Sequence, residues 1–233
     1  MDSTLIRICK YLYFHYVYLC CFMYCQYGAD RSNLRKIKGL RYFVYYLCEL
    51  VKDYYYDKLL GIKIRSNYTT SASIFNQPMF YGMLEKARGY LHLTADDVCV
   101  DLGCGEGRAV FFMALQNIKK SIGVELYQEV IDNAKKNLRS FKKKNTPIEF
   151  INADATDFDP SEANIFLMFN PFGEKTLEAV LLNIKKSLAV RPRKIRIVYF
   201  FAVHRSLLDN QDWLERDGEI IKNGVGLVWR NKP

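Results

Sequence analysis

The sequence predicts an α/β protein built on a doubly wound, mostly parallel sheet, with a helical extension before it. Apolar segments of strand length alternate with segments whose apolar residues recur at helical spacing. One predicted strand runs into a loop with three closely spaced glycines, and several others end at an acidic or amide residue. Because open α/β sheets bind ligands at the carboxyl ends of their strands, this edge is the predicted functional edge.

Length and composition favour one α/β domain over residues 64–233 and an aromatic-rich helical extension over residues 1–63. The 233 residues are 50% hydrophobic, which suffices for one substantial core. The net charge of +9 favours an acidic partner, and it leaves nucleic acid, an anionic membrane and an acidic protein open. Seven cysteines without a regular spacing indicate a reducing compartment, so we expect a cytoplasmic protein and no bound metal.

The extension begins with an uncharged segment, residues 11–27, which has basic residues on either side. This segment is short for a bilayer and contains several tyrosines and His15, whose polar atoms would need partners in hydrocarbon. We therefore expect a helix that lies on a membrane surface or docks on a partner protein, with a spanning helix as the alternative. Residues 1–30 would provide this contact. A second helix is predicted over residues 41–60 and ends at Gly61.

A predicted buried strand leads into the motif Asp101-x-Gly103-x-Gly105-x-Gly107. Glycine lets the backbone turn sharply and lets a ligand approach where a Cβ atom would collide. The helix that follows presents unpaired backbone N–H groups to such a ligand. A dinucleotide-binding loop would need glycine or alanine at position 108, where Arg108 stands, so the motif predicts another nucleotide-type ligand.

Three further predicted strands end at a polar residue that can face a ligand at the same edge. The segment 121–126 contains Glu125, whose carboxylate suits the two hydroxyls of a ribose. The segment 150–155 contains Asp154, and the apolar segment 165–173 contains Asn170. The remaining predicted elements are helices over 109–115, 128–138 and 176–188, a strand over 195–203, a short helix to about 213 and a hairpin-like pair over 219–229.

In their order, these segments resemble the motifs of class I S-adenosylmethionine-dependent methyltransferases, over roughly residues 75–205. The resemblance implies a Rossmann-like fold with a seven-stranded sheet, S-adenosyl-L-methionine as cofactor, and Asp154 beside the adenine. Candidate lid residues before the first motif are Tyr68, Gln77, Phe80 and Tyr81, for which ordinary packing is the alternative. The implied cofactor-binding residues are Asp101, Gly103, Cys104, Gly105, Gly107, Glu125, Leu126, Asp154, Ala155 and Asn170.

The tetrapeptide Asn170-Pro171-Phe172-Gly173 resembles the Asn/Asp-Pro-Pro-aromatic signature of amino methyltransferases, although phenylalanine replaces the second proline and glycine the aromatic residue. Asn170, Pro171 and Phe172 are therefore the candidate catalytic residues. The Asn170 side-chain oxygen and the Pro171 carbonyl can accept the two hydrogens of an amine. The Phe172 ring can stack on a planar acceptor or face a cation. We expect these groups to position the amine, since no base is identifiable in the sequence.

The longer pattern resembles the catalytic core of histone-lysine methyltransferases of the Dot1 type and their small relatives. This resemblance implies methyl transfer to an amine nitrogen, and it favours a protein lysine over nucleic acid as the acceptor. Two alternatives stay open. One is N-methylation of an RNA or DNA base, with the tyrosines of the extension as stacking platforms. The other is a non-enzymatic interaction module that retains the fold and is recruited to membranes.

Overall fold

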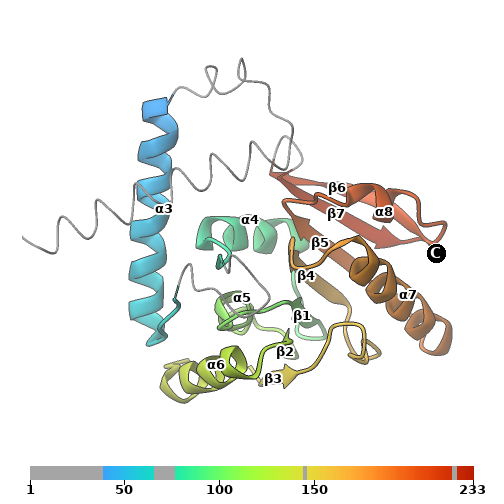
Figure 1. Cartoon of the computed structure of the whole chain (residues 1–233), viewed down its shortest axis with the longest axis horizontal. Helices are drawn as coiled ribbons and strands as arrows, with labels where there is room; N and C mark the ends of the chain where they lie inside the picture. Colours follow the sequence, from blue (N-terminus) through green and yellow to red (C-terminus); the bar gives the residue numbers. More distant parts are fainter. Residues whose placement is uncertain (1–38, 66–76, 144–145, 222–224) are drawn as a thin grey trace, which may run out of the picture. The chain divides into compact units, whose positions relative to one another are not determined.

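The computed structural model describes residues 39–65, 77–143, 146–221 and 225–233 (Figure 1). The chain divides into two compact units, residues 1–54 and residues 55–233, and the boundary falls within helix α3 (Gly39–Leu60). The predicted aromatic-rich helix over residues 11–27 lies outside the described residues, so its membrane or protein contact stays a prediction. Among the helices that the structure describes, none combines the length and the apolar character needed to cross a membrane.

The second unit is built on one seven-stranded sheet. Its strands are β1 (Val98–Leu102), β2 (Lys120–Glu125), β3 (Ile148–Asn152), β4 (Ile165–Phe169), β5 (Arg196–Phe200), β6 (Leu214–Ile221) and β7 (Gly226–Asn231). They lie in the order β3-β2-β1-β4-β5-β7-β6, and β7 runs antiparallel to the other six strands. The predicted doubly wound, mostly parallel sheet is thus confirmed. The strand order reverses between β1 and β4, which is the switch point where such sheets bind ligands.

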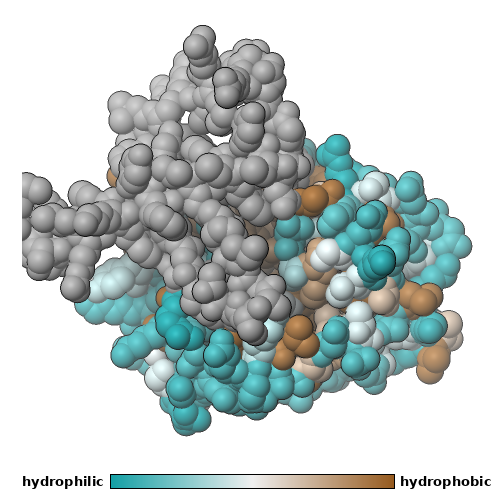
Figure 2. Space-filling model, in the orientation of Figure 1, coloured by the Kyte–Doolittle hydropathy of each residue, from teal (hydrophilic) through white to brown (hydrophobic). Residues whose placement is uncertain are grey.

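Helices cover both faces of the sheet, because a crossover between parallel strands places its helix on a face. In Figure 1, α4, α5 and α6 lie on one side, and α7 and α8 lie on the other. Their bounds are α4 (Tyr81–Leu91), α5 (Arg108–Met113), α6 (Gln128–Ser140), α7 (Glu174–Val190) and α8 (Arg205–Asp209). On the face that Figure 2 shows, the described residues are mostly hydrophilic, with separate hydrophobic spots.

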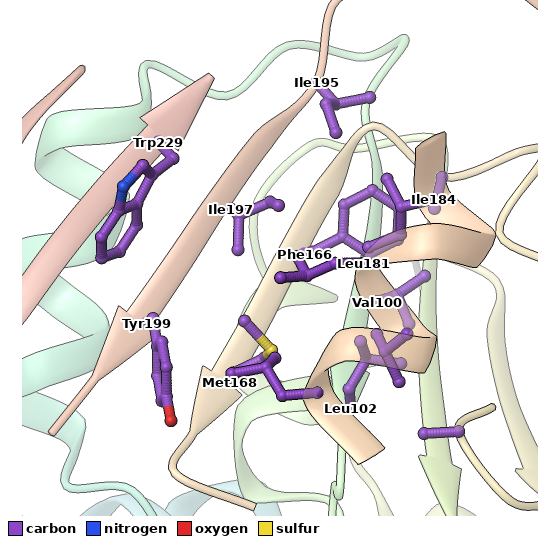
Figure 3. Packing of buried hydrophobic residues seen from close by; sticks show 14 of the residues in the cluster. Val100, Leu102, Phe166, Met168, Leu181, Ile184, Ile195, Ile197, Tyr199 and Trp229 are labelled. Carbon is purple, nitrogen blue, oxygen red and sulfur yellow. The ribbon is translucent and has the colours of Figure 1, made fainter. Parts of the chain in front are cut away.

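A hydrophobic core lies between the sheet and α7, and Figure 3 shows it from close by. Successive side chains of a strand point to opposite faces, so alternate residues of each central strand enter this core. In β1 these are Val98, Val100 and Leu102, and Asp101 consequently faces the other side of the sheet. The residues that α7 contributes recur at helical spacing and are Leu177, Val180, Leu181 and Ile184.

The C-terminal hairpin is longer than the sequence predicted. β6 begins at Leu214, several residues before the predicted start at 219. Its pairing with β7 is irregular, with register shifts between Arg216 and Gly218 and again between Glu219 and Ile221. Each irregularity breaks the alternation of polar and apolar residues from which a strand is read, and this explains the error.

Candidate functional site

The glycine loop that follows β1 adopts the conformation that its sequence predicts. Gly103, Gly105 and Gly107 have φ values of 79°, 55° and 93°, in the left-handed region that favours glycine. The amides of Gly103 and Cys104 donate to the carbonyl of Val124 at 2.9 and 3.0 Å, respectively. The loop is therefore tied to the end of β2 before α5 begins at Arg108.

Two buried carboxylates lie at the base of this loop. Asp101 belongs to β1 and Glu125 ends β2, and the two residues are only 6% and 9% exposed. Glu125 accepts hydrogen bonds from the Gly105 amide at 3.1 Å through Oε2 and from the Tyr127 amide at 3.2 Å through Oε1. Burial, and then the charge of Glu125, raise the pKa of Asp101 to about 7. Within the described part of the chain, no ion pair includes either carboxylate.

The end of β3 is fastened to the end of β2 beside these carboxylates. The Asn152 side-chain amide donates to the carbonyls of Glu125 and Leu126 at 3.0 and 2.8 Å. Asp154 follows, and its Oδ1 accepts both the amide and the hydroxyl of Thr156 at 2.8 Å each. Leu126 is 52% exposed, whereas Ala155 is buried. The structure thus places Glu125, Leu126 and Asp154 at one edge, in the order that the sequence predicts.

Cys104 points into the protein. Its sulfur lies where a side chain on Gly123 would stand, since a Cβ atom there would be 2.7 Å from Cys104 Sγ. Burial, followed by the charges of Asp101 and Glu125, raises the pKa of the Cys104 thiol well above its ordinary value. A thiol with a raised pKa is a poor nucleophile, so the Cys104 side chain serves packing.

The turn after β4 packs directly on the glycine loop. A Cβ atom on Gly103 would stand 2.5 Å from Pro171 Cβ, so only glycine leaves room for the proline ring. The next residue, Phe172, is half-buried and packs against the core on the α7 side. Asn170 and Pro171 therefore lie at the glycine loop, whereas part of the Phe172 ring is buried against the core and is not accessible to an acceptor.

Asn170 has a partner that sequence reasoning missed. Its Oδ1 accepts a hydrogen bond from the hydroxyl of Tyr199 at 2.9 Å. Tyr199 belongs to β5 and is 1% exposed. In the sequence it reads as one more core residue of a buried strand. The only available indication is that a buried tyrosine hydroxyl usually finds a hydrogen-bond partner.

A second polar cluster, on the other side of the glycine loop, was also missed. Arg108 Nη2 lies 2.7 Å from Asp57 Oδ2, and the Tyr81 hydroxyl donates to Asp57 Oδ1 at 2.8 Å. The guanidinium also lies over the Tyr81 ring, 5.2 Å from its centroid. This cluster explains why arginine stands at position 108, and it makes Tyr81, a predicted lid residue, a fully buried packing residue.

The residues that follow α3 are hydrogen-bonded to the glycine loop and to α6. Glu106 has a buried side chain, and its carboxylate accepts the amide of Arg65 at 2.6 Å and its Nε at 2.7 Å. The Asn137 side chain bonds the backbone of Lys63 through both ends of its amide and also donates to the Glu106 carbonyl at 3.2 Å. Gln77 and Phe80 are half-buried, and Tyr68 lies outside the described residues. Their predicted lid role stays a prediction.

Titratable side chains do not gather into a metal centre in the ranges that the structure covers. No group of three or more His, Cys, Asp or Glu residues there is arranged to hold a metal ion. The site is consequently described by its carboxylates, its glycine loop and the turn at Asn170.

Part of the chain is similar to a known protein family. Residues 99–190 match the methyltransferase domain family. Over 123 residues the chain is 31% identical to the histone-lysine N-methyltransferase, H3 lysine-79 specific, of Dictyostelium discoideum, and the match covers 46% of this chain and 7% of that protein. Over 90 residues it is 34% identical to a protein-lysine N-methyltransferase of Saccharolobus islandicus, covering 37% of this chain and 52% of that protein.

A solved structure with a similar arrangement is the RNA methyltransferase from Salinibacter ruber in complex with S-adenosyl-L-homocysteine. The TM-score is 0.47 and the identity 18%, and the match covers 66% of this chain and 91% of that chain. The matches to the two lysine methyltransferases named above span only part of the length of those relatives, 7% and 52%.

Proposed function

We propose that this chain is an S-adenosylmethionine-dependent methyltransferase that methylates an amine nitrogen, most specifically that of a protein lysine. The observation that carries the proposal is the buried pair Asp101 and Glu125 at the base of the glycine loop of a methyltransferase domain. Asp101 is buried beside Glu125 and has no cation paired with it among the described residues, so its charged form is costly and its pKa is raised. A ligand with positive charge relieves that cost, and S-adenosylmethionine carries a sulfonium and an ammonium group.

The residues at the edge fit such a ligand. Each oxygen of Glu125 takes one backbone hydrogen bond and can accept another, which leaves capacity for two ribose hydroxyls. The two bonds that Asp154 receives from Thr156 both fall on Oδ1, so its second oxygen can accept from the adenine amine. Gly103 is exposed, so its backbone is accessible to a ligand.

Methyl transfer needs little from the protein beyond positioning, because the sulfonium supplies a methyl group that is already activated. The chain must hold an amine with its lone pair aimed at that methyl group and exclude water. The Asn170 oxygen and the Pro171 carbonyl are the groups that would accept the amine hydrogens. Their fixed place beside Gly103 puts acceptor and donor sites at one edge.

The choice of a protein acceptor rests on the partial relatives and on the arginines near the end of α7. The two curated relatives are lysine methyltransferases by name. Among the basic residues 191–194, Arg193 serves the fold, since it donates to the carbonyls of Ala163 and Pro160 at 2.7 and 2.6 Å, and its charge therefore does not by itself indicate nucleic acid. We further propose a cytoplasmic protein that contacts a membrane or a partner through residues 1–30.

The proposal is tested by offering the full chain tritiated S-adenosylmethionine together with separated cell protein, RNA and DNA. We expect label in the protein fraction, released by acid hydrolysis as methylated lysine. Glu125→Ala should remove the label, and Glu149→Ala, a matched change of a half-exposed glutamate on the neighbouring strand, should not. Label confined to nucleic acid would contradict the proposal that the acceptor is a protein. Binding of NAD in place of S-adenosylmethionine would contradict the proposal that the chain is a methyltransferase.

A further inference from the structure

We propose that Tyr199 is a positioning residue of this site: its hydroxyl holds the Asn170 side chain so that the amide oxygen receives an N–H of the acceptor amine. The proposal rests on the proposed methyl transfer and deepens it. It begins from the hydrogen bond of 2.9 Å between the Tyr199 hydroxyl and Asn170 Oδ1.

The sheet brings these two residues together. β4 and β5 are parallel neighbours, with Met168 opposite Tyr199 and Phe169 opposite Phe200, so Asn170 comes directly after β4 at the level where β5 ends. Figure 3 shows the Tyr199 ring within the hydrophobic core, with its hydroxyl at the end of the ring that faces the carboxyl ends of the strands. Packing fixes the ring, and only the hydroxyl reaches the functional edge.

The backbone at Asn170 has an unusual conformation and closely packed neighbours. Asn170 and Phe201, the residues that follow β4 and β5, both have left-handed φ values, 45° and 48°. Such values are uncommon outside glycine, and they gather at functional sites where the surroundings impose them. Pro171 is seated on Gly103, and the rings of Phe169 and Phe201 meet edge to face at 5.3 Å. The side-chain rotation of Asn170 is the remaining freedom, and Tyr199 restricts it.

The hydrogen bond also decides which end of the amide serves as acceptor. An asparagine side chain offers an oxygen with two lone pairs and an NH₂ group with two donors. The proton of the Tyr199 hydroxyl selects the oxygen, and one lone pair of Oδ1 remains for a second donor. An amine is such a donor. Asn170 therefore prefers a ligand N–H at this position, which is the preference that N-methylation requires.

The experiment measures this preference directly, by calorimetry of the full chain with two probes. S-adenosylhomocysteine lacks the methyl group, and sinefungin carries an amine-bearing carbon in place of the methylsulfonium. The ratio of their dissociation constants reports the contact that the amine makes. We expect Tyr199→Phe to reduce the preference for sinefungin by about threefold to tenfold, while affinity for S-adenosylhomocysteine changes less than about twofold.

Two further variants separate positioning from general damage. Asn170→Ala should reduce the preference at least as much, and adding Tyr199→Phe to it should change nothing more, because the hydroxyl acts through Asn170. Tyr90→Phe is the matched control, since it removes a hydroxyl that bonds Asp217 at 3.4 Å, on α4 rather than at the site. This control should leave the ratio unchanged.

The outcomes are distinguishable. If neither probe binds the wild-type chain, the proposed function fails and this inference with it. If both bind and Tyr199→Phe keeps the wild-type ratio, the inference alone is wrong. Should Tyr199→Phe not fold, Asn170→Asp and Asn170→Leu replace it, because aspartate keeps an acceptor for Tyr199 and leucine does not. Aspartate should keep the preference for sinefungin and leucine should lose it, and equal ratios would overturn the inference.

Discussion

Two buried polar clusters border the glycine loop, and they differ in how their charges are balanced. In the first, Arg108 lies 2.7 Å from Asp57, and the Tyr81 hydroxyl donates to the same carboxylate. In the second, Asp101 and Glu125 are two acids whose proximity raises the pKa of Asp101 further. The acid of the first cluster therefore has a cation as its partner within the chain. The second cluster is stabilised when a positively charged ligand binds beside its carboxylates.

This difference separates a structural cluster from a binding site. A buried charge is costly unless it is paired, so a fold selected for stability alone would pair or neutralise Asp101. The same fold does pair Asp57 with Arg108, although burial still raises the pKa of the Asp57 carboxyl above its ordinary value. A buried acid without a cation among the described residues, at the switch point of the sheet, is the arrangement expected of a ligand site.

The largest expected effect is on the paired cluster. Arg108→Ala leaves the Asp57 carboxylate buried without its cation, and it should lower the free energy of unfolding by about 3–5 kcal/mol. Urea denaturation followed by circular dichroism measures the loss. Lys185→Ala removes an exposed contact with Asp212, and it should change the free energy of unfolding far less, because solvent screens an exposed ion pair. Equal losses in the two variants would show that the Arg108 cluster does not stabilise the fold.

Removing a charge from the cluster of Asp101 and Glu125 should stabilise the fold, whereas removing Arg108 destabilises it. The pKa of Asp101 is raised from 3.8 to about 7, so between these values the folded protein keeps a proton that the unfolded chain loses. Stability therefore falls as the pH rises from about 4 to about 7, and Asp101→Asn removes this dependence. Relative to wild type, the variant should gain up to about 4 kcal/mol above pH 7 and little near pH 4. Melting temperatures of wild type and Asp101→Asn, measured from pH 4 to pH 7, test this prediction. A difference between the two proteins that does not change with pH would contradict the raised pKa of Asp101.

Much of this arrangement could be predicted from sequence because it is local. The glycine loop, the strand ends at Glu125 and Asp154, and the turn at Asn170 are each readable within a few residues. Their roles toward a cofactor stay predictions. The partners Asp57 and Tyr199 could not be found, because Asp57 lies 51 residues from Arg108, and Tyr199 has the same pattern as its core neighbours. Contacts of this kind depend on strand order, which no short motif encodes.

The third prediction concerns donor binding. Glu125→Ala removes the carboxylate expected to accept the ribose hydroxyls, together with its bond to the Gly105 amide. We expect the donor to bind about tenfold to a hundredfold more weakly, equivalent to about 1.5–3 kcal/mol. Titration calorimetry with S-adenosylmethionine provides the measurement. Arg108→Ala, measured under conditions where it is folded, should retain donor affinity within a few fold. If Arg108→Ala weakened donor binding more than Glu125→Ala did, the Arg108 cluster would be the binding site and the Glu125 cluster the structural one.

The smallest expected effect is at Gly103, where the loop meets the turn that carries Asn170. Gly103→Ala places a Cβ atom 2.5 Å from Pro171 Cβ at a φ of 79°, so both the backbone and the proline must shift. The left-handed conformation alone costs an alanine about 1–2 kcal/mol. We expect a loss of that size in unfolding free energy, and a larger loss in methyl transfer than in donor affinity, because Asn170 moves with Pro171. Gly173→Ala is the matched control, since its new Cβ atom would meet nothing within 4 Å. If both alanines leave transfer unchanged, the seating of Pro171 on Gly103 does not position Asn170.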